Sequence, residues 1–135
     1  LAREVTDDGI RTAFREHERE TREQIGNLDR CFQVLGEAPQ RVTCRPVDGL
    51  RQEHDQFVRD RPSREVMTMF ALGAESKTEG FEIASYRALV NMAGVLGEQE
   101  CARLLQENLR QEEAMAERVD QLSRDVGRQM QETMR

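Results

Sequence analysis

Glutamate and histidine side chains fall on the core-facing stripes of three predicted helices, where apolar residues would be expected. Glu79 and Glu82 are three residues apart, so a helix places them on one face together with Leu72 and Ile83. Burial of an unpaired carboxylate costs several kcal/mol. Each of these groups therefore needs a hydrogen-bond partner, a proton or a cation.

The same pattern recurs in two further segments. His17 lies on an apolar stripe near the start of the chain with Glu20 three residues after it, and Glu112 replaces an apolar residue in the last helical segment. Neighbouring helices pack about 8–10 Å apart, so these side chains can converge on one centre. Four carboxylates and an imidazole cannot all be ionised together without a compensating cation. A pair of divalent metal ions supplies that charge in known helix bundles.

A metal-free interpretation also fits this pattern. Thr21 and Gln24 lie on the same stripe as His17, so the middle of this helix carries a polar patch. Such a patch can be a hydrogen-bonded layer that fixes the register of the helices. The glutamates would then bond to arginine, to Tyr86 or to the backbone, and the spacing alone leaves both interpretations open.

The chain has the composition of one all-α domain. It contains 135 residues rich in glutamate, arginine, glutamine, alanine and leucine, with three prolines and no tryptophan. The apolar periodicity predicts long helices over residues 9–35, 62–96 and 98–130, and a short crossover helix over residues 47–59. Residues 1–5 are predicted to be the last turn of a preceding bundle helix that is largely absent from this sequence. A single domain is expected over residues 1–135.

Charge and composition argue against several function classes. The net charge of −6 disfavours a nucleic-acid or anionic-membrane surface, and no apolar run approaches the length of a transmembrane helix. The three cysteines lack metal-type spacing, so we expect reduced thiols in a cytoplasmic protein, with Cys31 and Cys101 as core fillers. His54 is interpreted as a half-buried packing residue. No Ser-His-Asp or Cys-His pattern supports nucleophilic catalysis.

Four motifs occur in the order found in a known family. They are H-E-R-E-T-R-E-Q at residues 17–24, C-R-P-V-D-G-L at 44–50, E-G-F-E-I-A-S-Y at 79–86 and L-L-Q-E-N-L-R-Q-E-E at 104–113. With these motifs the chain resembles the YciE/YciF family of bacterial ferritin-like stress proteins, which are related to rubrerythrins. The resemblance covers nearly the whole chain. It implies a ferritin-like four-helix bundle, a homodimer and a dinuclear metal site, with iron as the expected metal and manganese or zinc as alternatives.

The resemblance also implies roles for individual residues. The implied metal ligands are Glu20, Glu79, Glu82, Glu112 and His17, with Gln24 and Tyr86 as supporting hydrogen-bond partners. The family commonly has His at the position of Gly80, Tyr at Phe81 and an acidic residue at Ala116, so this chain departs from it there. Glu75 has no counterpart and is expected at the edge of the core-facing surface. The absent first helix is expected either upstream of this sequence or from another subunit.

The expected function is therefore the binding of two divalent metal ions in a bacterial stress response. If the site performs chemistry, the implied type is oxidation of Fe(II) by dioxygen or peroxide. The physiological reaction does not follow from the motifs, so enzymatic activity is left open. The alternative is a metal-free helical module that dimerises through its apolar stripes. A phosphate or nucleic-acid binder is disfavoured by the negative charge.

Overall fold

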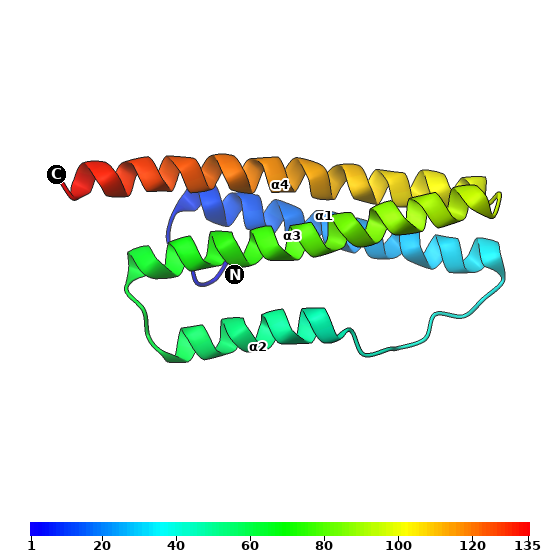
Figure 1. The fold of residues 1–135 in the computed structure, drawn as a ribbon, viewed down its shortest axis with the longest axis horizontal. Coiled ribbons are helices and arrows are strands. Elements are labelled where there is room, and N and C mark those ends of the chain that lie inside the picture. The colour runs from blue at the N-terminus through cyan, green and yellow to red at the C-terminus, as the bar shows by residue number, and fades with distance from the viewer.

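The structure is an all-α bundle of three long helices and one short helix (Figure 1). The computed structural model describes residues 1–135, and its elements are α1 (Asp8–Leu35), α2 (Arg45–Arg59), α3 (Arg64–Val95) and α4 (Gln99–Thr133). It contains no strand, so the expected all-α bundle with a short crossover helix is confirmed. None of the four helices combines the length and the apolar character that a membrane-spanning segment requires.

Short polar side chains and glycine set the helix ends. The side chains of Asp7 and Ser63 each accept a hydrogen bond from the backbone N–H three residues further on, at 2.9 and 3.3 Å. Because Ser63 is the cap, α3 begins at Arg64 rather than at residue 62. Gly36 ends α1 in the left-handed conformation, with φ of 71°, which a residue with a Cβ adopts only under strain.

The central member of the bundle is α4. It packs against both α3 and α1, whereas no Cα atom of α1 lies within 8 Å of one in α3. A tight turn at Gly97, with φ of 75°, folds α4 back along α3, and α4 continues to Thr133 rather than ending at residue 130 (Figure 1). The two other long helices are therefore joined to each other mainly through α4.

The short helix α2 lies on the side of α3 that faces away from α4 (Figure 1). The rings of Phe57 and Phe70 stack with their centroids 3.8 Å apart, and His54 stacks on Phe70. His54 Nε2 also lies 2.7 Å from Glu4 Oε2, which ties α2 to the N-terminal segment. His54 is half-buried in this contact, and it has the packing role that the sequence predicts.

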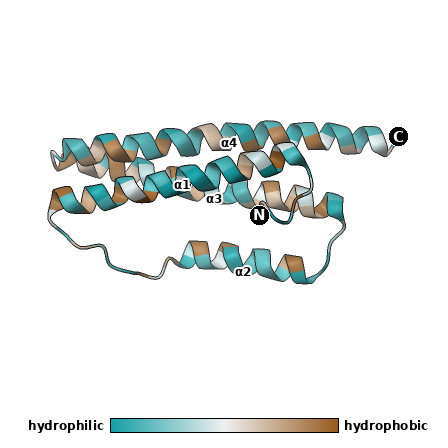
Figure 2. Ribbon diagram, turned by 180° about the vertical axis from the view of Figure 1, so that it is seen from behind, coloured by the Kyte–Doolittle hydropathy of each residue, from teal (hydrophilic) through white to brown (hydrophobic).

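Two apolar cores flank a polar layer in the middle of the bundle. The first core lies near the start of α1 and consists of Val5, Ile10, Ala13, Phe14, Met67, Ala71, Leu72, Met115 and Val119. The second lies near the start of α4 and consists of Cys31, Tyr86, Ala93, Cys101, Leu104, Leu105 and Leu109. Figure 2 shows the middle of α1 as hydrophilic, with apolar residues towards both of its ends. The candidate site residues lie in this intervening layer.

Candidate metal centre

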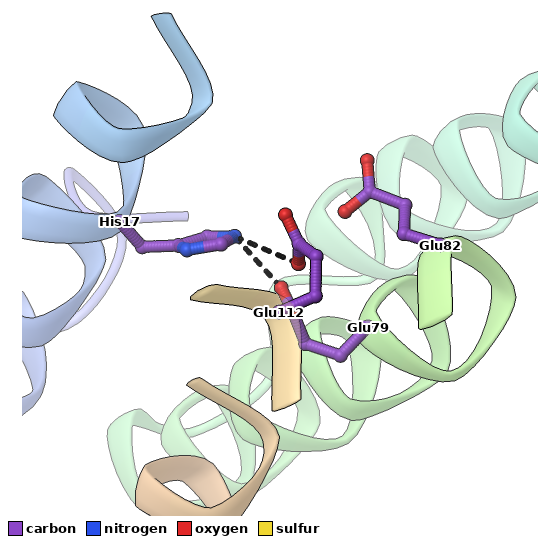
Figure 3. Close-up of side chains that lie close together, drawn as sticks. All are labelled: His17, Glu79, Glu82 and Glu112. Carbon is purple, nitrogen blue, oxygen red and sulfur yellow. Dashed lines mark ion pairs between the residues drawn. The ribbon is translucent and has the colours of Figure 1, made fainter. Parts of the chain in front are cut away.

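Four side chains from three helices converge in the polar layer (Figure 3). His17 comes from α1, Glu79 and Glu82 from α3, and Glu112 from α4. Each offers one potential ligand atom, and these atoms all lie within 4.8 Å of one another. Four of the five ligands implied by the resemblance are thus brought together.

The imidazole of His17 faces the carboxylates with its Nε2 atom. This nitrogen lies 2.8 Å from Glu79 Oε1 and 3.6 Å from Glu112 Oε2, as the dashed lines in Figure 3 mark. The 2.8 Å approach is an ion-pair distance without the alignment of a hydrogen bond. A single imidazole therefore faces carboxylates from two different helices.

Glu79 and Glu112 are fully buried, and their exposed fraction is 0%. None of their four carboxylate oxygens has a hydrogen-bond partner. No lysine or arginine forms an ion pair with either residue. Because native structures almost always satisfy buried polar atoms, four oxygens without partners at one point need compensation by protons or by a cation.

The electrostatics of the cluster favour protonated carboxyls in the absence of a cation. Burial raises the pKa of both Glu79 and Glu112 well above the ordinary range. Burial, together with the charge of Glu112, raises the pKa of Glu82 to about 7. A bound divalent cation would replace these protons, and carboxylate with imidazole is a donor set that suits iron, manganese and zinc. The residues present therefore fit a metal ion.

Glu20 does not belong to the converging group, although the sequence predicts it as a ligand. Its side chain is 32% exposed, and its Oε2 atom lies 3.4 Å from Nδ1 of His17, the ring nitrogen that faces away from the carboxylates. Glu20 follows His17 by three residues, but its partly exposed side chain lies on the outer side of the imidazole. It supports the imidazole from behind, as carboxylates that orient metal-binding histidines do.

Glu75, which the sequence analysis places at the edge, is instead buried beside the cluster. It is 8% exposed, and its Oε1 atom lies 3.6 Å from His17 Nε2. Its negative charge also contributes to the raised pKa of Glu79 and of Glu82. The spacing could have predicted this burial, because Glu75 precedes Glu79 by four residues and therefore lies one turn away on the same helix face.

A hydrogen-bonded network adjoins the cluster and joins the three long helices. The Tyr86 hydroxyl donates to Gln24 Oε1 at 3.1 Å, which joins the two residues that were predicted as supporting hydrogen-bond partners. The side chain of Asn108 donates to the Gln24 carbonyl oxygen and to the Tyr86 hydroxyl, each at 3.3 Å. Burial raises the pKa of Tyr86 to about 12. Asn108 was missed, although it precedes Glu112 by four residues on the same helix.

A cleft of about 350 Å³ leads from the surface to the cluster between α1 and α3. His17, Glu75 and Glu82 line it, while Glu79 and Glu112 lie behind them. The departures from the family at Gly80 and Ala116 lie outside the converging group. A Cβ on Gly80 would meet no atom within 4 Å, so that position faces away from the cluster.

The chain is similar to proteins of one family. A family model described as "Domain of unknown function (DUF892)" matches residues 1–132. Protein YciF of Escherichia coli (strain K12) is 32% identical over 115 residues, which span 84% of this chain and 69% of YciF. The crystal structure of the E. coli stress protein YciF superposes with a TM-score of 0.89 at 29% identity, covering 94% of this chain and 80% of that one. YcfI from Rhodopseudomonas palustris gives a TM-score of 0.84 at 29% identity, covering 88% of this chain and 76% of that chain.

Proposed function

This chain belongs to the family described as a domain of unknown function (DUF892), and on that premise we propose that it is a stress-response protein that binds two divalent metal ions. The expected metal is iron, with manganese and zinc as alternatives. The observation that supports this proposal most directly is the set of four buried carboxylate oxygens of Glu79 and Glu112 that lack any partner. Such groups are costly unless a cation or protons compensate them.

The proposed ligands are the converging residues. Glu79 and Glu112 project from facing helices and can each offer two oxygens, while Glu82 and His17 lie on either side of them. Glu75 lies close enough to His17 to supply a further carboxylate to a second ion. Glu20 holds the imidazole through Nδ1, so that Nε2 stays directed at the carboxylates.

If the bound metal is iron, the chemistry that it would supply is oxidation from Fe(II) by dioxygen or a peroxide. The protein residues around it would bind and orient the ions and manage protons. The carboxyls of Glu79, Glu82 and Glu112 have raised pKa values, so binding of cations displaces protons from them. The cleft between α1 and α3 is wide enough to admit a small oxidant.

Metal content tests the proposal. The full chain is stripped with a chelator, reloaded separately with Fe(II), Mn(II) or Zn(II), and analysed for bound metal and for its thermal midpoint Tm. We expect close to two ions per chain and a rise in Tm, because a ligand that binds only the folded state stabilises it. Well under one ion per chain with an unchanged Tm would reject the metal proposal and favour the metal-free interaction module.

We also propose that the protein is a homodimer, as its family resemblance implies. Light scattering coupled to size-exclusion chromatography measures the mass directly. A mass of one chain at micromolar concentration would contradict this part of the proposal and leave the metal site unaffected.

A further inference from the structure

Two buried cysteines meet where the end of α1 packs on the start of α4. Cys31 is 7% exposed and Cys101 is 3% exposed, although 70 positions separate them in the sequence. The Cys101 Sγ atom lies 3.8 Å from the carbonyl oxygen of Cys31. Both cysteines also line one cleft, so their side chains lie on the same side of the α1–α4 contact. From this contact we propose that Cys31 and Cys101 are a redox-active dithiol, which a hydroperoxide converts to a disulfide joining α1 to α4.

The surroundings of the pair differ from those of the third cysteine. Cys31 and Cys101 belong to the second apolar core, together with leucines of α4, whereas Cys44 is exposed on the segment before α2. None of the converging carboxylates belongs to this core. The inference is therefore independent of the proposed metal site. Simple core filling, which the sequence predicts for these residues, explains their burial but does not require the two cysteines to be in contact.

A second cleft gives small molecules access to the pair. It has a volume of about 210 Å³ and is lined by both cysteines and by apolar side chains of α1 and α3, including Leu28, Leu35 and Met92. A water molecule occupies about 30 Å³ in the liquid, so the cleft has room for hydrogen peroxide or a small organic hydroperoxide. The apolar lining suits a neutral molecule better than a charged oxidant.

The reaction balances with one hydroperoxide per dithiol. One of the two thiols attacks the terminal peroxide oxygen, the O–O bond breaks, and the remaining oxygen leaves as an alcohol or water after taking up the thiol proton. The other thiol then attacks the resulting sulfenic acid, an S–S bond forms, and the S–O bond breaks with release of water. The two sulfurs lose two electrons in total, and the peroxide gains them.

The environment of Cys31 bears on the rate of the reaction. Burial raises the pKa of its thiol to about 11, so Cys31 remains protonated at neutral pH. The thiolate is the nucleophile in such reactions, so little of Cys31 is in the reactive form at neutral pH. Its protonation also makes the overall reaction slow at neutral pH and faster in alkali.

The test uses the full chain with Cys44→Ser, reduced and treated with a chelator to remove metal. This variant keeps only the two buried thiols and is exposed to hydrogen peroxide. We expect the loss of both thiols on titration in denaturant, and a linked pair of peptides that is lighter by two hydrogen atoms and is separated by dithiothreitol. Because the link closes a long loop, we also expect Tm to rise by roughly 10 °C.

The matched controls carry a second substitution, Cys31→Ala or Cys101→Ala, on the Cys44→Ser background. Circular dichroism checks that they fold. They should show neither the peptide link within one chain nor the rise in Tm. The proposal is overturned if both thiols of the parent variant remain open to alkylation after peroxide treatment. It is equally overturned if one of the two cysteines is oxidised to sulfinic acid with the other still free, or if the only links are between chains.

Discussion

At the scale of single residues, the polar layer is governed by the cost of burying carboxylates. Glu79 and Glu112 lack hydrogen-bond partners, and the one group facing both is the imidazole of His17. When no cation is bound at such a site, the carboxylates become protonated, because a neutral carboxyl has a much lower desolvation free energy than a charged one. On the proposed function, the protein would alternate between a protonated form and a metal-bound form of this site.

Glu112 gives the sharpest test of this view. Glu112→Leu should remove most of the metal binding and leave the metal-free protein as stable as before or more stable, because an apolar residue costs less than a buried charge at this position. Metal analysis and denaturant unfolding measure the two effects. The matched control is Glu113→Leu on the same helix, since Glu113 is partly exposed and lies outside the cluster. Equal metal content in Glu112→Leu and the parent protein would show that Glu112 is no ligand.

The raised pKa values predict how the stability of the metal-free protein depends on pH. The ordinary pKa of glutamate is 4.5, and Glu82 reaches about 7 in the folded state, with Glu79 and Glu112 shifted in the same direction. Between pH 4.5 and about 7 the folded state thus binds more protons than the unfolded state, so the free energy of unfolding falls as pH rises.

Thermal unfolding of the chelator-treated protein between pH 5 and pH 7 measures this dependence, and we expect Tm to be higher at the lower pH. Glu82→Gln should flatten the curve, because glutamine cannot take up the proton. A Tm that is constant or rises over this interval would contradict the assignment. With metal present the trend should reverse, because cations compete better when protons are scarce.

At the scale of the helices, capping residues and apolar periodicity predict the helices well. They predict the arrangement of the site residues less well. Capping residues and glycines place the ends of α1 and α3, and apolar periodicity identifies the face of each helix that is buried. Spacing does not determine how far each helix rotates about its own axis on its neighbour. Spacing therefore did not indicate that Glu20 lies outside the converging group or that Glu75 is buried beside it. The meeting of Cys31 with Cys101 likewise depends on how α1 packs against α4.

A glycine inside α1 and the glycine that follows its last residue should respond to alanine in opposite ways. Gly36→Ala should lower the free energy of unfolding by roughly 1 kcal/mol, because residue 36 has a φ of 71° that alanine adopts only under strain. Gly26→Ala should raise it by roughly 0.5–1 kcal/mol, because Gly26 lies inside the helix and a Cβ there meets no atom within 4 Å. Urea unfolding of the metal-free proteins compares the two. If both substitutions changed the free energy of unfolding in the same direction and by the same amount, α1 would not end at Leu35.

At the scale of the whole molecule, the two apolar cores are separated by a layer in which contacts between helices are mostly polar. The Gln24, Tyr86 and Asn108 network is the part of this layer that needs no metal, since its members satisfy one another. Each of the three comes from a different long helix. The network therefore links α1, α3 and α4 to one another even when the carboxylates are protonated.

Tyr86→Phe tests this role, because it removes one hydroxyl and keeps the ring in the second apolar core. The substitution leaves Gln24 Oε1 without its donor and Asn108 without one acceptor, so we expect a loss of about 1–2 kcal/mol in the free energy of unfolding of the metal-free protein. Ser85→Ala is the control on the same helix, since Ser85 bonds only to the Phe81 carbonyl oxygen of its own turn. It should cost less than about 0.5 kcal/mol. Because the bond lost in Tyr86→Phe connects different helices, a loss no larger than that of the control would mean that these links between helices do not stabilise the bundle.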